Sequence, residues 1–491
     1  MSSILTNNGA MVALQTLKSI NNDLSKTQSQ ISTGKNIASA KDNASVWAIS
    51  KVMESDVKGF QGISDSLALG QSTLAVAAGA AESVTDLLTD IKGKIVAAQE
   101  SNVDREKIQT DIEALTSQID SIVGAAQFNG LNLVKGTEDV DILSSMDRAA
   151  NGNVSASHIT INRQDLSTTV GTYGSDGDLS DRGAESSATV ITGPRTADIE
   201  VTYAASENYT VSIGDKSVTV DAVDDDDVTE SALAAAINNL GIEGVSARID
   251  GNTLKVESML DFDDVQIEVS HSGGGAITVD GSSSATVNQR AETITFNQAA
   301  KVNDGDSFRV TYGGNNYDYI AGKGETMEDV ARGLKIAIDS AGLESVSTKV
   351  TQNDTGEWEL NIANHGSGDV TDLAFDGKEG GTASGGLFGL KSLDVTTEFG
   401  AENALGTIET LINNSIDAAA EFGSAQGRIE TQTDFVSNLT DSLKSGIGAM
   451  VDADMEEASA RLQALQVQQQ LGVQSLSIAN QAPQTILSLF R

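Results

Sequence analysis

Long heptad repeats constrain both ends of this 491-residue chain to extended helices. On the N-terminal side, apolar residues recur at alternating steps of three and four over residues 49–98, with Asp56 and Gly70 as interruptions. This pattern predicts one helix of about fifty residues, roughly 75 Å long. A second repeat over residues 108–122 predicts a helix that folds back antiparallel to the first.

The C-terminal side has the same pattern. Heptad positions are apolar over residues 405–450, and the same register continues through residues 455–486. The chain contains only two prolines, so few positions force a helix to stop. Pairing of the two ends into an antiparallel coiled coil would bury both stripes. We therefore expect helical arms made from both termini.

The middle of the chain has a different composition, rich in Gly, Ser, Thr, Asp and Val, with alternating stretches that predict strands. The pattern of a hairpin, a short helix and two strands occurs around Leu233 and again around Leu334. We expect two related α+β modules, at about residues 190–270 and 291–376, joined by the flexible stretch "SGGGAITVDGSSS". The predicted fold class is therefore α+β and multidomain, with helical arms and a β-rich insertion.

The formal net charge of -39 is concentrated in the middle of the chain. It is +2 over residues 1–42, -8 over 43–170, -25 over 171–395 and -8 over 396–491. No acidic residue follows Glu457. The two ends can therefore approach copies of themselves without strong repulsion, whereas nucleic acid is an improbable partner.

Residues that could carry chemistry are few and scattered. The chain has no Cys, and its three His, at 158, 271 and 365, match no metal-binding motif. The acidic run Asp224–Asp227 lacks the spacing of a calcium loop, and we expect it to be a solvated loop. We therefore predict no catalytic residue, no cofactor and no metal.

The first residues and the apolar runs of the chain give information about its cellular location. The first fifteen residues have neither the basic segment nor the apolar segment of a cleaved signal peptide. No apolar run is long enough to span a bilayer, so we expect no membrane insertion.

Three motifs resemble those of bacterial flagellins. The stretch "SKTQSQISTGKNIASAKDNASVWAIS" resembles the N-terminal signature of that family, "QFNGLNLVKG" resembles its turn from helix to strands, and the last forty residues resemble its C-terminus. The resemblance covers roughly residues 1–170 and 398–491. The matching motif residues include Ser32, Gly34, Ala40, Asp42, Asn43, Asn129, Gly130, Asn480, Gln481 and Pro483.

The resemblance implies a self-polymerising subunit of the bacterial flagellar filament, a structural protein of swimming motility and not an enzyme. By analogy, residues 1–42 and 451–491 form an inner coiled-coil domain, residues 43–170 and 396–450 form a helical rod with a small β region, and residues 171–395 are exposed. The expected partners are other copies of the chain, an export chaperone, and junction and cap proteins. The expected location is extracellular, reached by export without a cleaved signal peptide.

The resemblance also indicates which side chains form the core of the assembly interface. They are the apolar heptad residues of the first and last helices, and some of them could instead pack only within one subunit, because heptad spacing does not say which helix a stripe faces. The candidates are Leu14, Leu17, Leu24, Ile31, Leu462, Leu465, Leu476, Ala479 and Ile486.

Two alternatives stay open from the sequence. A hook-filament junction protein has similar terminal helices, and a filament-displayed adhesin could bind a glycan through the central modules. A further departure from the family concerns innate recognition, because Lys92, Gly93 and Lys94 stand where many flagellins have an Arg, an acidic residue and Leu. Strong activation of the animal receptor for flagellin is therefore doubtful.

Overall fold

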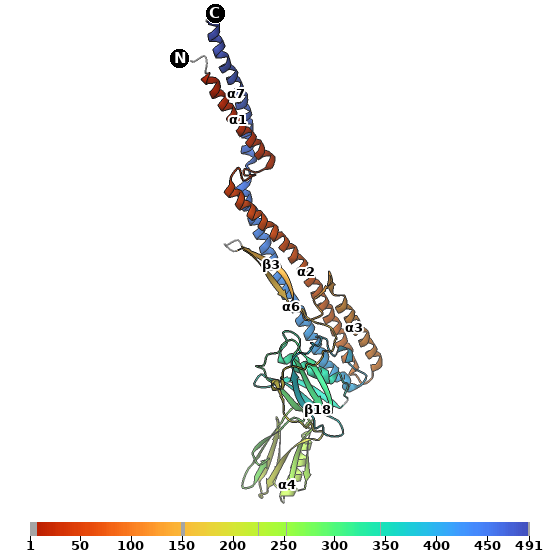
Figure 1. Ribbon diagram of the computed structural model, residues 1–491. Helices are drawn as coiled ribbons and strands as arrows, with labels where there is room; N and C mark the ends of the chain where they lie inside the picture. Colours follow the sequence, from red (N-terminus) through yellow and green to blue (C-terminus); the bar gives the residue numbers. More distant parts are fainter. Residues whose placement is uncertain (1–6, 149–152, 224, 252, 344, 490–491) are drawn as a thin grey trace. The chain divides into compact units, whose positions relative to one another are not determined.

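The computed structural model describes residues 7–148, 153–223, 225–251, 253–343 and 345–489 (Figure 1). Helical regions at both ends flank a β-rich middle, which is an α+β architecture. The chain divides into two compact units, which we name the terminal unit and the central unit. The terminal unit comprises Met1–Ser72, Asp141–Thr160 and Gln426–Arg491, and the central unit comprises Thr73–Val140 and Ile161–Ala425.

The long helices lie where the heptad repeats predict them. The repeat over residues 49–98 is one helix, and the repeat over 108–122 lies in the helix that follows, whose first turn is capped by the Asp104 carboxylate. The α-helices are α1 (Asn8–Thr33), α2 (Ala44–Ala98), α3 (Arg105–Ala125), α4 (Asp226–Asn239), α5 (Met327–Asp339), α6 (Glu398–Val451) and α7 (Met455–Leu489).

The continuous heptad register past residue 450 gives no sign that the last helical stretch is broken, yet α6 ends at Val451 and α7 begins at Met455. The Asp454 carboxylate caps the new helix by accepting hydrogen bonds from the backbone N–H groups of Glu456 (2.9 Å) and Glu457 (3.2 Å). A side chain that caps a helix start competes with continuation of the preceding helix. The break is thus set by one capping residue and not by the apolar pattern.

Short antiparallel strands make up the rest of the fold. Between the helical regions, the strands are β1 (Gln127–Phe128), β2 (Leu131–Asn132), β3 (Val140–Arg148), β4 (Val154–Ile161), β5 (Gly183–Glu185), β6 (Arg195–Thr202), β7 (Asn208–Ile213), β8 (Lys216–Asp221), β9 (Val245–Asp250), β10 (Thr253–Ser258), β11 (Val265–His271), β12 (Ala276–Val279), β13 (Ser284–Val287), β14 (Glu292–Phe296), β15 (Ser307–Tyr312), β16 (Asn315–Ile320), β17 (Val346–Gln352), β18 (Trp358–Asn364) and β19 (Ala374–Lys378).

Most of these strands form two pairs of sheets in the central unit. The first sheet pair has the strand orders β12-β6-β10-β9 and β13-β11-β7-β8, and α4 belongs to it. The second sheet pair has the orders β17-β18-β14-β5 and β16-β15-β19, with α5 packed against β16, β17 and β18. The order β6-β10-β9 corresponds to β14-β18-β17, and β11-β7-β8 corresponds to β19-β15-β16.

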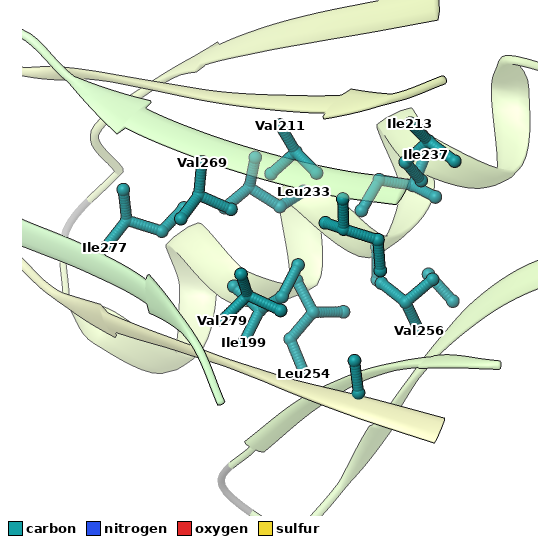
Figure 2. Close-up of a cluster of buried hydrophobic side chains, with 14 of the residues drawn as sticks. Ile199, Val211, Ile213, Leu233, Ile237, Leu254, Val256, Val269, Ile277 and Val279 are labelled. Carbon is teal, nitrogen blue, oxygen red and sulfur yellow. The ribbon is translucent and has the colours of Figure 1, made fainter. Parts of the chain in front are cut away.

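The core of the first sheet pair is a closed apolar cluster. Figure 2 shows Leu233 and Ile237 of α4 among valines and isoleucines of the surrounding strands, such as Val211 and Ile199. Alternation of buried and exposed positions along each strand supplies this cluster. Burial of so many apolar side chains is the main source of stability for this part of the chain.

The stretch "SGGGAITVDGSSS" is not a flexible joint throughout. Its residues Ala276–Val279 are strand β12, which pairs antiparallel with β6. Ile277 and Val279 are buried in the apolar cluster, so burial holds this segment in the sheet. The glycines before this strand favoured the prediction of a flexible segment, so the four-residue strand was not predicted.

The acidic run at residues 224–227 was expected to be a loop, and that expectation is wrong for its described part. Asp225 is the N-cap of α4, and its carboxylate accepts a hydrogen bond from the backbone N–H of Val228 (2.9 Å). Asp226 and Asp227 lie in the first turn, where carboxylates interact favourably with the helix dipole. Asp224 lies outside the described residues.

A two-stranded sheet of β3 and β4 belongs to the terminal unit. Arg148 of β3 pairs with Asp56 of α2, and the Gln432 side chain of α6 donates a hydrogen bond to the backbone oxygen of Ser144 (2.8 Å). Asp56 interrupts the apolar stripe of α2 in the sequence, and its ion pair with the hairpin explains that interruption.

Candidate assembly interface

The first and last helices of the terminal unit pack against each other. Figure 1 shows α1 and α7 side by side, and two side-chain hydrogen bonds fix their antiparallel direction. Asn7 donates to the backbone oxygen of Ala479 (2.8 Å), and Gln469 donates to the side-chain oxygen of Asn21 (2.8 Å). Residues near the start of α1 therefore lie beside residues near the end of α7.

Close approach along this pair depends on two small residues. A Cβ placed on Gly472 would lie 3.2 Å from a methyl group of Leu17, and a Cβ on Gly9 would lie 3.9 Å from the Cβ of Ala479. The two glycines weaken the heptad pattern in the sequence, but they let the helices approach at these levels.

Most of the interface residues named from the sequence lie on the sheltered side of this pair. Leu465 is 7% exposed, and its neighbours on the same stripe are half-buried. Because α1 and α7 pack on each other, we interpret this stripe as the seam within one chain. The half-buried members are Leu17, Leu24, Ile31, Leu462, Leu476 and Ala479.

Leu14 and Ile486 differ from the other candidates. Leu14 is 57% exposed, so it does not belong to the sheltered stripe. The side chains of residues 482–489, among them Pro483 and Ile486, lie outside the described part of the chain.

A second apolar stripe is exposed on α7. Val467, Leu471 and Ile478 follow heptad spacing on α7, and Ile478 is 70% exposed. We name Val467, Leu471 and Ile478 the outer strip, because their spacing places them on one face of α7. Met11, Val12, Leu14 and Val473 are also exposed but do not lie on that face. The outer strip was not identified from the sequence, although its spacing of four and seven was a usable signal.

Backbone hydrogen bonds join the two places where the helices break. The break between α1 and α2 and the break between α6 and α7 meet at an antiparallel bridge between Lys35 and Asp452. The backbone N–H of Asn36 donates to the oxygen of Val451 (2.7 Å), and the N–H of Ala453 donates to the oxygen of Gly34 (2.9 Å). We name this contact the joint.

The N-terminal motif residues build the joint. Gly34 ends α1 with φ of 69°, a left-handed conformation that favours glycine. The Asp42 carboxylate accepts hydrogen bonds from the backbone N–H groups of Ser39 (2.9 Å) and Ala38 (3.2 Å), and the bond from Ser39 is the main cause that lowers its pKa. Asn43 accepts a hydrogen bond from the backbone N–H of Val46 (3.3 Å) at the start of α2.

The other motif residues occupy turns or exposed positions. Asn129 and Gly130 both have positive φ, 51° and 83°, in the two-residue turn between β1 and β2. An Asn-Gly pair is the preferred sequence for such a turn. Ser32, Ala40, Asn480 and Gln481 are exposed.

Two of the histidines lie in separate clusters of side chains. His271 contacts Glu207, whereas His365 contacts Asp261, Ser347 and Arg290. Among the described residues, no group of three or more His, Cys, Asp or Glu side chains could hold a metal ion. None of the described helices is both long and apolar enough to cross a membrane.

Comparison with known families identifies both helical ends. Residues 4–139 match the family model of the bacterial flagellin N-terminal helical region. Residues 405–490 match the model of the bacterial flagellin C-terminal helical region. These two matches contain the long helices and the joint described above.

Relatives match the whole length of the chain. Flagellin A of Rhizobium meliloti is 30% identical over 494 residues, with 100% of each chain covered. A flagellin of Brucella melitensis biotype 1 is 26% identical over 493 residues, again with 100% of each chain covered. Among solved structures, a flagellar hook-associated protein-3 from Legionella pneumophila matches 82% of this chain and 98% of its own, with 10% identity and a TM-score of 0.34.

Proposed function

Because the chain belongs to the bacterial flagellin family, we propose that its paired ends form the core of the flagellar filament. The chain is a structural, self-assembling subunit of the extracellular filament that serves motility, and it is not an enzyme. The single observation that carries this conclusion is the full-length match to flagellins at 30% identity. The proposals below concern which residues perform the assembly.

The α1–α7 pair offers two apolar faces with different roles. The sheltered stripe, centred on Leu465, holds the two ends of one chain together as an antiparallel coiled coil. The outer strip, centred on Leu471, meets other copies. This division is supported by exposure, because several large apolar side chains left in water on one helix face are typical of a surface that another protein covers. The near absence of acidic residues at both ends favours contacts between identical copies.

The domain boundaries follow the same logic. We propose an inner domain of residues 1–42 and 451–491, a rod of residues 43–170 and 396–450, and exposed domains over 171–395. The joint at Lys35 and Asp452 supports the first boundary, since both helical stretches break there. The charge of -25 over residues 171–395 supports exposure of the middle to water.

The two sheet pairs of the central unit are proposed to be related modules that arose by duplication. Their matching strand orders and the position of one helix in each support this, as does the recurrence of the sequence pattern between Leu233 and Leu334. Strands β12 and β13 extend the first module to Val287, beyond the boundary near residue 270 expected from the sequence.

Further partners follow from the family. We propose that an export chaperone, junction proteins and cap proteins bind this chain, and that it is exported without a cleaved signal peptide. The lack of Cys is compatible with passage in an unfolded form. Sequencing the N-terminus of the chain recovered from filaments would test the processing.

Electron microscopy of seeded assembly tests the proposed core. The full chain is added to short filament seeds beside a version that ends at Asp454 and therefore lacks α7. We expect long filaments from the full chain and none from the truncated chain. A full chain that only caps the seeds would favour the junction-protein alternative, and a truncated chain that still elongates would contradict the role of α7.

A further inference from the structure

A cavity of about 360 Å³ lies inside the central unit. Its walls come from the segment Asn162–Leu166, the turn between β16 and α5, one face of α5, the glycine-rich segment Ala383–Phe388, and one face of α6. This volume falls within the range of about 300–1,000 Å³ that is usual for small-molecule sites. The assembly function described above uses none of these residues.

Glycines shape two of the cavity walls. A Cβ on Gly385 would lie 2.1 Å from the backbone oxygen of Ser167, and a Cβ on Gly333 would lie 2.4 Å from the ring of Tyr319. The backbone N–H of Gly386 also donates to the oxygen of Asp165 (2.7 Å). Backbone packing at this distance holds the walls in place, so the cavity is a defined feature of the fold.

Arg163 brings an uncompensated guanidinium to the cavity. Its Nε is buried and has no hydrogen-bond partner among the described residues. Its Nη1 makes a long hydrogen bond to the backbone oxygen of Lys135 (3.5 Å). A buried donor without a partner is costly, so this group favours a ligand with an acceptor.

The cavity lining also contains negatively charged side chains. Asp417 and Glu421 are four residues apart on α6, line the cavity and are exposed. In the part of the chain that the structure describes, neither carboxylate has an ion-pair partner within 4.0 Å. These side chains favour a ligand that can donate hydrogen bonds.

Glu325 adds a carboxyl group that is partly protonated near neutral pH. Its Oε2 accepts a hydrogen bond from the hydroxyl of Tyr319 (2.9 Å), and burial is the main cause that raises its pKa to about 7. Near neutral pH this group is therefore present in both protonated and ionised forms, and it can donate as well as accept.

The mixture of charges decides the class of ligand. Lys323 and Arg332 also line the cavity, but they form ion pairs with Asp139 and Glu328. An anion would be attracted by Arg163 and repelled by Asp417 and Glu421, whereas a cation would be repelled by Arg163 and attracted by the two carboxylates. A neutral ring bearing several hydroxyl groups satisfies both kinds of partner, because each hydroxyl both donates and accepts. We propose that this cavity binds a neutral carbohydrate ring.

Titration of the full-length monomeric chain with neutral methyl glycosides tests this proposal. The probes are methyl glucoside, methyl galactoside, methyl mannoside and N-acetylglucosamine, with glucuronate and glucosamine as charged counterparts, and binding is followed by saturation-transfer NMR and calorimetry. We expect saturable binding of at least one neutral sugar, and weaker binding of its charged counterparts.

Three variants locate the binding. We expect Arg163→Ala to weaken the affinity about tenfold or more, since it removes the buried donor. Glu421→Gln, a conservative change on an exposed helix surface, should weaken it by a smaller factor. Arg248→Ala is the matched control, because Arg248 is an exposed arginine of the first sheet pair that does not line the cavity.

Several outcomes would overturn the proposal. They are the absence of saturable binding, which would mean that the cavity holds only water, preferential binding of a charged probe, and unchanged affinity in both Arg163→Ala and Glu421→Gln. Seeded assembly of the same variants separates this inference from filament formation, because we expect all three to elongate seeds normally.

Discussion

Gly70 of α2 lies directly against Ile142 of β3 in the terminal unit. A Cβ placed on Gly70 would be 2.3 Å from the Cδ1 of Ile142 and within 3.2 Å of two further atoms of that side chain. A second contact of the same kind brings Gly59 against Met146, where the corresponding distance to Cε is 2.5 Å. The hairpin therefore packs on α2 at positions where the helix has no side chain.

Replacement of Gly70 by alanine tests this packing. Alanine in a helix interior normally stabilises by about 1 kcal/mol relative to glycine. Here the overlap with Ile142 should reverse the sign and destabilise by about 1 to 3 kcal/mol. Gly62→Ala on the same helix is the control, because no atom lies within 4 Å of its added Cβ, and it should stabilise. Urea unfolding measures both changes, and equal stabilisation by the two variants would contradict the packing.

A disulfide can test whether α1 and α7 of one chain pair with each other. The chain has no Cys, and the Cβ positions of residues 9 and 479 are 3.9 Å apart, within the range of disulfides. In filaments of the double variant Gly9→Cys with Ala479→Cys, oxidation should link residues of the same copy. A non-reducing gel should then show a monomer with altered mobility. A ladder of linked copies would mean that α1 pairs with α7 of a neighbour, and Ala479→Cys alone is the control.

Aspartate substitutions separate the two apolar faces of α7. Leu471→Asp puts a charge on the outer strip, and we expect it to block elongation of seeds, because a carboxylate buried between copies costs several kcal/mol. Leu465→Asp should also block elongation, by disrupting the seam within one chain. Gln468→Asp is the control on an exposed polar position of the same helix and should elongate. Normal filaments from Leu471→Asp would remove the outer strip from the interface.

Glu325 should make the stability of the central unit depend on pH. Its folded pKa, about 7, is above the ordinary value of 4.5, so the folded state binds the proton more tightly than the unfolded state. Its contribution to the free energy of unfolding is therefore complete below about pH 4.5 and is lost as the pH rises through 7. We expect a loss on the order of 3 kcal/mol.

Glu325→Gln provides the comparison for that pH dependence. The amide cannot ionise, so urea unfolding of the variant should vary less between pH 5 and 8 than unfolding of the parent chain, and the variant should be the more stable of the two at pH 8. Parallel curves for the two proteins would show that Glu325 titrates near its ordinary value.

Innate recognition should be weak. Lys92 forms an ion pair with Glu409, and Lys94 forms one with Asp111 (2.5 Å). Both ammonium groups therefore have partners within the chain. Gly93 stands where many flagellins have an acidic residue, and Lys94 stands where they have Leu. We expect a low response in receptor reporter cells, measured beside an enteric flagellin at equal monomer concentration. A response equal to that of the enteric protein would refute this expectation.

The sequence predicts the helices better than it predicts their contacts. Heptad spacing identified α2, α3 and the helical stretch that contains α6 and α7, because apolar periodicity is a local property. It did not reveal which stripe faces which helix, and so it grouped the exposed Leu14 with the sheltered Leu465. In the sequence, Gly70 only interrupts the apolar repeat of α2. The absence of a side chain there is explained by packing against a hairpin more than seventy residues away.

Strand prediction failed where glycine and serine dominated. The four residues of β12 lie between "SGGG" and "DGSSS", and only their pairing with β6 reveals them. The segment near Gly385 has a similar composition, yet close backbone contact with Ser167 holds it against its neighbour. Composition reports the freedom of an isolated segment, whereas tertiary contacts decide how much of it remains.

The joint has a mechanical consequence. Two separate backbone crossings, at Gly34 and at Val451, are tied by hydrogen bonds across an antiparallel bridge. A single extended linker would swivel about its bonds, but two linkers tied side by side resist relative rotation about their common axis while still allowing them to flex together. A propeller shaft that is turned from one end requires this combination, since torque must pass through every subunit while the shaft bends.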